Sequence, residues 1–173
     1  MTNDINITLI LDYIGFYAPL ILIFISIIVL QNKIKYLHVY IIGLILNNIL
    51  NAILKYAIKE PRPSKDSRIL EIAISNGKRF GVDSYGMPSG HAQNCAYNLA
   101  FITLVFNNPF ITGLYLVITS LSLYQRHKYF NHTSLQLIVG FVIGLCFGYL
   151  VYLVGNKWLK GNLTMKPDDY APK

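Results

Sequence analysis

Three short stretches of the sequence, KYAIKEPRP, PSGH and RHKYFNH, contain side chains that together could handle a phosphate group. They supply three cations, Lys55, Arg62 and Arg126, and two imidazoles, His91 and His132. A guanidinium fork matches the oxygens of a phosphate, and an ammonium adds a point charge. A neutral imidazole can attack phosphorus and form a phosphohistidine, while a second imidazole protonates the departing oxygen and then activates water.

The PSGH stretch, residues 88–91, stands where a polar turn meets an apolar segment. Pro88 and Gly90 would shape the turn, and the backbone amides from Ser89 to His91 would begin the helix that follows. Unpaired amides and the helix dipole both favour negative charge at such a position. The stretch therefore indicates an anion site next to the first imidazole.

The sequence offers no metal-binding pattern to accompany these groups. No triplet of carboxylates and no cluster of histidine and cysteine suggests a metal centre, so we expect neither a metal nor another cofactor. The cations would then stabilise the charge of a phosphoryl transition state unaided.

These stretches must be positioned by helices that cross a membrane. Of the 173 residues, 54% are hydrophobic and only 13% are charged, which is unlike a soluble domain. A membrane span needs about 20 apolar residues. We predict an all-α integral membrane bundle over residues 1–155 and a polar C-terminal tail over 156–173. The predicted spans cover about 7–30, 36–58, 92–106, 109–124 and 133–154, with a long polar loop between the second and the third.

Counting the five spans places all three motifs on the same membrane face. Several lysines, among them Lys33, Lys35 and Lys157, fall on the opposite face. Basic loops favour the cytoplasm, but the motif side also carries many basic residues. If some of those cations have another role, such as binding phosphate, the opposite face is the cytoplasmic one and the site faces the lumen or the outside of the cell. The net charge of +7 does not indicate nucleic acid binding, because no basic run is long enough.

Polar residues follow one face of the second and third predicted spans. Asn47, Asn51 and Lys55 recur every four residues, and His91, Asn94 and Asn98 recur at intervals of three and four. Such side chains at membrane depth either line a polar site or join helices by hydrogen bonds. For the asparagines alone, hydrogen bonds between helices are the simpler explanation, and a transporter or channel remains a less favoured alternative.

The three motifs, taken in order, resemble those of the type 2 phosphatidate phosphatase superfamily. Its general pattern is KxxxxxxRP, then PSGH, then SRxxxxxHxxxD, and the match runs from Lys55 to Gln136. The resemblance implies that His132 is the nucleophile and His91 the general acid and base. It also implies a set of residues that bind the phosphoryl oxygens: Lys55, Arg62, Ser89, Gly90 and Arg126.

Two positions depart from the general pattern. Gln125 replaces the serine, and Gln136 replaces the aspartate that would orient the nucleophilic ring. His132 and Gln136 are four residues apart on an expected helix, so the amide oxygen can still accept the imidazole N–H. The wider sequence is similar to the dolichyldiphosphatase branch, in which a glutamine at this place is usual.

The branch resemblance implies hydrolysis of a polyprenyl diphosphate to the monophosphate, with membrane lipids as the surroundings. The site would face the lumen or exterior, as in the endoplasmic reticulum or a host-derived membrane. Two alternatives stay open: a broader phosphatase for phosphatidate and other lipid monophosphates, and a catalytically silent phospholipid-binding protein. Gln136 is the feature that keeps the silent protein in consideration.

Other polar residues are assigned no chemistry. We expect Asp12, in the first span, to be hydrogen-bonded in the interior or at the interface. We expect His38 to lie at the interface and His127 to be exposed. Residues 67–74, SRILEIAI, could form a short amphipathic helix on the membrane over the pocket.

Overall fold

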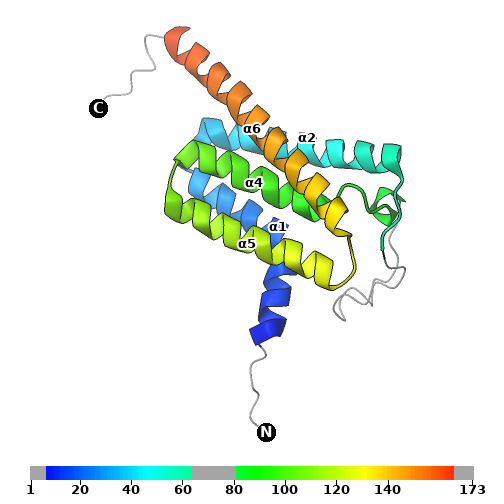
Figure 1. Ribbon diagram of the computed structural model, residues 1–173. Coiled ribbons are helices and arrows are strands. Elements are labelled where there is room, and N and C mark those ends of the chain that lie inside the picture. Colours follow the sequence, from blue (N-terminus) through cyan, green and yellow to red (C-terminus); the bar gives the residue numbers. More distant parts are fainter. Residues whose placement is uncertain (1–6, 64–80, 166–173) are drawn as a thin grey trace.

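The computed structural model describes residues 7–63 and 81–165, with side chains described up to residue 159. Over these residues the protein is helical, with no strand beyond one isolated bridge between Pro61 and Tyr85. The elements, labelled in Figure 1, are α1 (Ile7–Leu30), α2 (Ile34–Ile58), the short 3-10 helix η1 (Gly81–Ser84), α4 (Gly90–Phe106), α5 (Pro109–Lys128) and α6 (Ser134–Met165). The prediction of an all-α bundle is confirmed for the described part of the chain. The predicted helix over 67–74 and most of the predicted polar loop lie outside it.

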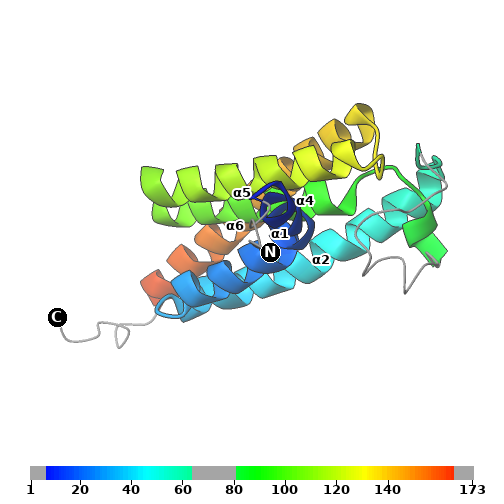
Figure 2. The same ribbon diagram turned by 90° about the horizontal axis from the view of Figure 1, so that it is seen from below.

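Helix α4 forms the centre of the bundle. It packs against α1, α2, α5 and α6, and Figure 1 shows α6 crossing it. Figure 2 shows α2 and α5 on opposite sides of the bundle. Because neighbours surround α4, it buries polar as well as apolar side chains, including Gln93 and Asn98.

Three glycines let α6 approach the backbone of α4. A Cβ atom added at Gly140 would lie 2.5 Å from the carbonyl oxygen of Ser89, and one at Gly148 would lie 2.8 Å from that of Tyr97. A Cβ atom at Gly144, between them, would collide with the carbonyl oxygen of Gln93. Small residues repeated every four positions are a common way to bring membrane helices together.

The polar stripe on α2 forms hydrogen bonds to α4. Asn47 Nδ2 donates to Asn94 Oδ1 at 2.9 Å, and Asn51 Nδ2 donates to Gln93 Oε1 at 2.8 Å. The side-chain amide of Gln93 donates back to Asn47 Oδ1 at 2.9 Å. These bonds use the asparagines to join the two helices, as the simpler explanation predicted.

A second polar cluster lies further along α4, away from its PSGH end. Asn98 Oδ1 accepts from the hydroxyls of Tyr40 and Ser26. Ser26 Oγ in turn lies 2.9 Å from the hydroxyl of Tyr115. The side chain of Asn98 thus joins α4 to α1 and α2, and Ser26 extends the network to α5.

Two helix ends differ from the sequence prediction. Helix α5 continues to Lys128, so Gln125 and Arg126 lie on its last turn and not in the predicted link. Asp12 of α1 explains the extension, because Lys128 Nζ and the Tyr129 hydroxyl donate to its Oδ2 at 2.7 and 2.6 Å. These bonds confirm the prediction that Asp12 is hydrogen-bonded.

The last helix is also longer than predicted. Helix α6 runs to Met165, so the first part of the segment predicted as a tail, residues 156–165, is helical. Contacts with α2 support the extension: the Tyr36 hydroxyl donates to Asn156 Oδ1 at 3.3 Å, and Gly155 packs against Val39.

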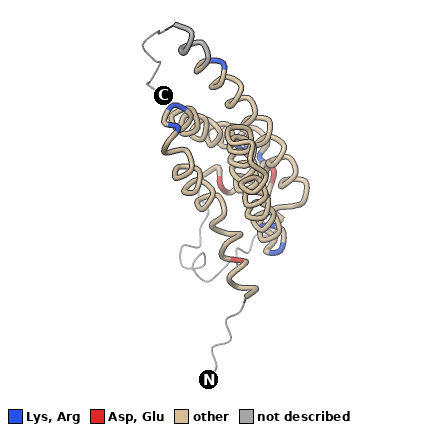
Figure 3. Tube along the Cα trace, turned by 90° about the vertical axis from the view of Figure 1, so that its left-hand side faces the viewer, with Lys and Arg blue, Asp and Glu red and all other residues tan. Residues whose placement is uncertain are grey.

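Three helices are long and apolar enough to cross a membrane: Ile7–Leu30, Ile34–Ile58 and Ser134–Leu159. They match the first, second and fifth predicted spans and indicate an integral membrane protein. Within the described ranges, α4 and α5 are not among the helices that meet this measure. Figure 3 shows Lys and Arg toward the helix ends, with long uncharged stretches between them.

Candidate active site

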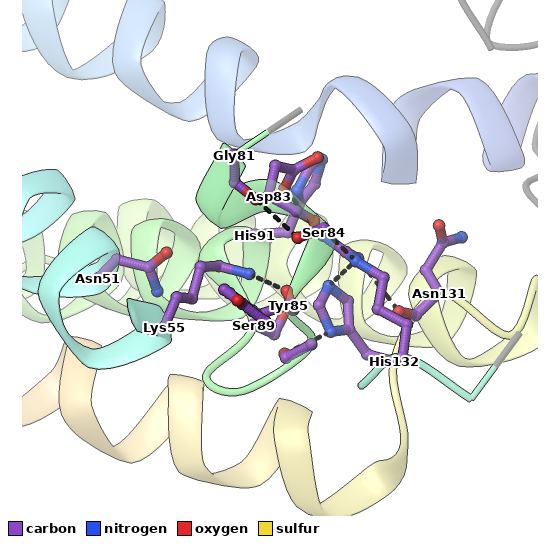
Figure 4. Close-up of polar contacts among 12 residues, drawn as sticks. Asn51, Lys55, Gly81, Asp83, Ser84, Tyr85, Ser89, His91, Asn131 and His132 are labelled. Carbon is purple, nitrogen blue, oxygen red and sulfur yellow. Dashed lines mark hydrogen bonds and ion pairs between the residues drawn. The ribbon is translucent and has the colours of Figure 1, made fainter. Parts of the chain in front are cut away.

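Four helix ends meet at one end of the bundle, on the right in Figure 1. They are the end of α2, the start of α4, the end of α5 and the start of α6. The three motifs occupy these ends, so segments that are far apart in sequence converge in space. Figure 4 shows side chains from each motif, including Lys55, His91 and His132, around the turn that precedes α4.

The imidazole of His132 is held in one tautomer. Its Nδ1 lies 2.9 Å from the carbonyl oxygen of Gly86 and 3.2 Å from Gln136 Oε1, two groups that only accept hydrogen bonds. Nδ1 therefore carries the proton, and the lone pair resides on Nε2. Arg62 Nη1 lies 2.9 Å from Nε2 and donates to it (Figure 4).

The surroundings of His132 keep its ring neutral. The side chain is only 3% exposed. Burial first, and then the positive charges of Arg62, Lys55 and Arg126, lower the pKa of His132 from 6.5 to about 2. The ring is neutral at physiological pH and keeps the Nε2 lone pair that a nucleophile requires.

Gln136 is fixed on both sides of its amide. Its oxygen faces His132, and its Nε2 donates to Glu60 Oε1 at 2.7 Å and to the carbonyl oxygen of Pro61 at 2.9 Å. Gly86 packs against this amide so closely that an added Cβ atom would lie 2.6 Å from it. The glutamine at the position of the aspartate in the family pattern is therefore a firmly held neighbour of the His132 ring.

Two cations, Lys55 on the last turn of α2 and Arg62 just beyond that helix, are held near His132 by main-chain oxygens and one carboxylate. Lys55 Nζ donates to the carbonyl oxygen of Tyr85 at 2.6 Å, and the lysine is 4% exposed. Arg62 also forms an ion pair with Asp83 at 2.8 Å. Both cations are thus placed beside the ring before any ligand binds.

The start of α4 is the place where the sequence predicted an anion site. Ser89 is the N-cap, and its Oγ accepts from the backbone N–H of Ala92 at 3.4 Å. The backbone N–H of Ser89 donates to the carbonyl oxygen of Gln136 at 3.1 Å, so this amide is already engaged. The amides of Gly90 and His91 follow it at the helix start, where intrahelical partners are lacking.

His91 is capped by a guanidinium in the same way as His132. Its Nε2 contacts Arg126 Nη2 and lies 3.1 Å from the carbonyl oxygen of Phe16. One nitrogen cannot accept from an arginine and donate to a carbonyl together. Because a guanidinium only donates, we assign Nε2 as the acceptor of Arg126 here and the Phe16 oxygen as the partner of the protonated ring.

Arg126 connects the two imidazoles electrostatically. It is 5% exposed and lies 4.9 Å from the ring centroid of Phe16. Its charge also contributes to the lowered pKa of His132. A single cation is therefore close enough to act on both histidines.

Sequence reasoning did not identify four residues at this site: Phe16, Glu60, Asp83 and Gly86. Glu60 lies in KEPRP, two residues before Arg62, and Gly86 lies just before the PSGH motif, so their positions in sequence could have suggested them. The sequence carries no signal for Asp83 or Phe16, because their contacts depend on how separate segments pack. Gln125, which stands where the family pattern has a serine, is fully buried and packs against Gly15 of α1.

Comparison with known proteins gives the family. The family model described as the PAP2 superfamily matches residues 36–160, which include all three motifs. Dolichyldiphosphatase 1 of Dictyostelium discoideum is 27% identical over 139 residues, covering 74% of this chain and 56% of the relative.

Two other relatives are comparable. Lipid phosphate phosphatase epsilon 1, chloroplastic, of Arabidopsis thaliana is 29% identical, over 69% of this chain and 41% of its own. Lipid A 4'-phosphatase of Porphyromonas gingivalis is 29% identical, over 61% of this chain and 46% of its own. The chain spans about half the length of these curated relatives. No solved structure matches significantly. The family match confirms the resemblance drawn from the motifs, and the chain belongs to the PAP2 superfamily.

Proposed function

We propose that this protein is a membrane phosphatase that removes a phosphate group from a lipid through a phosphohistidine at His132. The observation that carries the proposal is the geometry of that ring. Nδ1 is anchored by the Gly86 carbonyl and by Gln136, while Nε2 keeps its lone pair and faces Arg62. This is the arrangement that a nucleophilic imidazole needs.

Binding of a phosphate group would free both imidazoles. Each Nε2 is capped by a guanidinium, Arg62 on His132 and Arg126 on His91. An arriving phosphate accepts charge-assisted hydrogen bonds from both arginines and draws them toward its oxygens. Lys55 and the amides of the α4 start would complete the binding of these oxygens.

The chemistry then proceeds in two balanced steps. His132 Nε2 attacks phosphorus, and the bond from phosphorus to the leaving oxygen breaks as protonated His91 gives that oxygen a proton. A water molecule then attacks the phosphohistidine and gives its proton to His91, which releases phosphate and returns His132 to its neutral form. The three cations stabilise the charge on the equatorial oxygens, and the proposal requires no metal.

The substrate that we favour is a polyprenyl diphosphate, which would lose its terminal phosphate. Support comes from the relative named dolichyldiphosphatase and from the glutamine at position 136. The names of the other two relatives support a second candidate, a phosphatase that acts on lipid monophosphates. Initial rates on matched lipid monophosphates and diphosphates separate these candidates.

We further propose that all five long helices cross the membrane. The 20 residues of α5 span about 30 Å at ~1.5 Å per residue, which matches the hydrocarbon thickness. The 17 residues of α4 need not be apolar throughout, because other helices surround it. The site would then lie at the lumenal or extracytoplasmic face, with Lys33, Lys35 and Lys157 at the cytoplasmic end.

Phosphate release from a purified sample tests the proposed function. We expect the protein in detergent to hydrolyse a polyprenyl diphosphate in the presence of a metal chelator, and His132→Ala to abolish release. His38→Ala, a change to an exposed histidine near the other end of α2, is the matched control and should keep full activity. A requirement for divalent metal would contradict the mechanism, and lipid binding without phosphate release would indicate a silent phospholipid-binding protein.

A further inference from the structure

The feature that carries a further inference is a line of contacts behind the nucleophile, on the side away from the substrate. It runs from His132 Nδ1 to Gln136 Oε1 at 3.2 Å, and from Gln136 Nε2 to Glu60 Oε1 at 2.7 Å. The family pattern places an aspartate directly against the ring. Here the neutral amide of Gln136 takes that place, and the carboxylate of Glu60 lies behind the amide, on its side away from the ring.

The amide of Gln136 has only one orientation that satisfies its neighbours. Its oxygen accepts from His132 Nδ1 and from the backbone N–H of Thr133 at 3.3 Å. Its nitrogen donates to the Glu60 carboxylate and to the Pro61 carbonyl oxygen at 2.9 Å. A flipped amide would set N–H against N–H and oxygen against oxygen, so the direction of the line from carboxylate to ring is fixed.

Glu60 is itself held in place, and by the same turn that holds the ring. Its carbonyl oxygen accepts from the backbone N–H of Gly86 at 2.7 Å, and the carbonyl oxygen of Gly86 accepts from His132 Nδ1. Glu60 therefore reaches Nδ1 by two routes, one through a side-chain amide and one through the main chain. Because Glu60 and Arg62 flank Pro61, one short rigid segment fixes the groups on both sides of the imidazole.

We propose that Glu60 is a positioning residue that acts on His132 through Gln136 and supplies the negative charge that the glutamine lacks. When Nε2 bonds to phosphorus the ring gains positive charge, while the proton stays on Nδ1. A carboxylate that polarises the amide makes its oxygen a stronger acceptor for that proton. Glu60 also opposes the three cations that surround the ring. This inference rests on the proposed function, because it concerns the same nucleophile.

Neutralising Glu60 without removing its hydrogen bond tests the proposal. Glu60→Gln can still accept from Gln136 Nε2, so a merely structural role would be preserved. A hydrogen bond to a charged group is stronger than one to a neutral group by about 1 kcal/mol, so we expect kcat to fall by about fivefold with KM nearly unchanged. Lys59→Gln, a change of charge of equal size and opposite sign at the adjacent exposed position, is the control and should keep wild-type kcat.

A double variant tests whether Glu60 acts through the amide. The methionine of Gln136→Met fills a similar space but cannot form the hydrogen bonds to His132 and Glu60. In that background, Glu60→Gln should cause no further loss of kcat, because the line is already broken. The same loss of about fivefold in both backgrounds would overturn the route through Gln136, and wild-type kcat in Glu60→Gln would overturn the role of Glu60.

A spectroscopic measurement keeps this inference separate from the proposed function. The signal of the Nδ1 proton of His132 can be observed without substrate in a 1H–15N NMR spectrum. We expect this signal to shift upfield in Glu60→Gln and to keep its position in Lys59→Gln. An unchanged Nδ1 signal would reject the role of Glu60, whatever the enzyme hydrolyses. A wild-type protein that fails to release phosphate would reject the function instead. If Glu60→Gln does not fold, Glu60→Asp, whose carboxylate is withdrawn by one methylene, replaces it with the same expectation.

Discussion

At the scale of single residues, the ring of His132 lies between hydrogen-bond acceptors and cations, an arrangement that would suit the proposed nucleophile. Hydrogen-bond acceptors lie at Nδ1, and the cations Arg62 and Lys55 lie on the side where phosphate would bind. The acceptors fix the tautomer, while burial and the cations favour the neutral ring. Two predictions at this scale concern His132 and its neighbour Gln136.

The first prediction is that His132 does not titrate near neutral pH. Because its pKa is lowered to about 2, its ring signals in NMR spectra of histidine-labelled protein should stay constant between about pH 5 and 8. His132→Ala assigns these signals by their absence. A titration step near pH 6.5 would contradict the prediction. The same lowered pKa affects stability. Below about pH 6.5 the histidine of the unfolded chain binds a proton, whereas the buried ring of the folded protein stays neutral, so acidification favours unfolding.

The second prediction is that Gln136→Asp, which restores the aspartate of the family pattern, lowers the proposed phosphatase activity. The variant loses the N–H groups that bind Glu60 and Pro61, and it sets one carboxylate against another. We expect kcat on the lipid diphosphate to fall by about tenfold or more. Adding Glu60→Gln supplies a donor to the new aspartate and should recover part of the loss. Activity of Gln136→Asp at or above the wild-type level would show that the glutamine is not adapted to Glu60.

At the scale of elements, the site depends on how closely α6 approaches α4. Gly140 packs against Ser89, the residue that caps α4, and Gln136 lies one turn before it on α6. Moving α6 away from α4 would therefore separate the PSGH turn from the residues that orient His132. The glycines at positions 140, 144 and 148 thus help to position the site through the packing of α6 against α4.

Replacement of the central glycine tests this dependence. Gly144→Val should push the two helices apart, lower the free energy of unfolding by about 1–3 kcal/mol and reduce kcat, because a side chain there would collide with Gln93. Gly113→Val is the matched control, since the same substitution on α5 meets open space. Thermal unfolding and turnover should be measured on both variants. Equal behaviour of the two would show that the close approach does not position the site.

Apolar periodicity and length predicted most of the helices, because a membrane-spanning segment must satisfy its backbone internally. The ends of α5 and α6 were predicted less well. The extension of α5 to Lys128 depends on Asp12 of α1, and that of α6 depends on Tyr36 of α2. Such contacts join distant segments, so no local pattern reports them. The sequence shows the glycine repeat of α6 as G-x-x-x-G, but it does not show that α4 is the helix that packs against this repeat.

At the scale of the whole molecule, the bundle places its chemistry at one end and its lysine-rich turns at the other. Motif spacing was sufficient to predict that His91, His132 and three cations would share one end of the bundle, because the motifs lie at the ends of successive predicted helices that alternate in direction. It was not sufficient to predict Glu60 as the partner of Gln136 or the Phe16 carbonyl beside His91, since these contacts arise from packing. A lipid substrate suits this architecture, because its phosphate can occupy the cationic end while its tail stays in the bilayer.

The most direct test of the account is to trap the covalent intermediate. A polyprenyl diphosphate labelled in its terminal phosphate should be mixed with the protein and quenched during turnover under conditions that preserve phosphohistidine. We predict that the label is found on the peptide that contains His132 and is absent from His132→Ala. Turnover with no labelled protein, or with the label on His91, would contradict the assignment of His132 as the nucleophile.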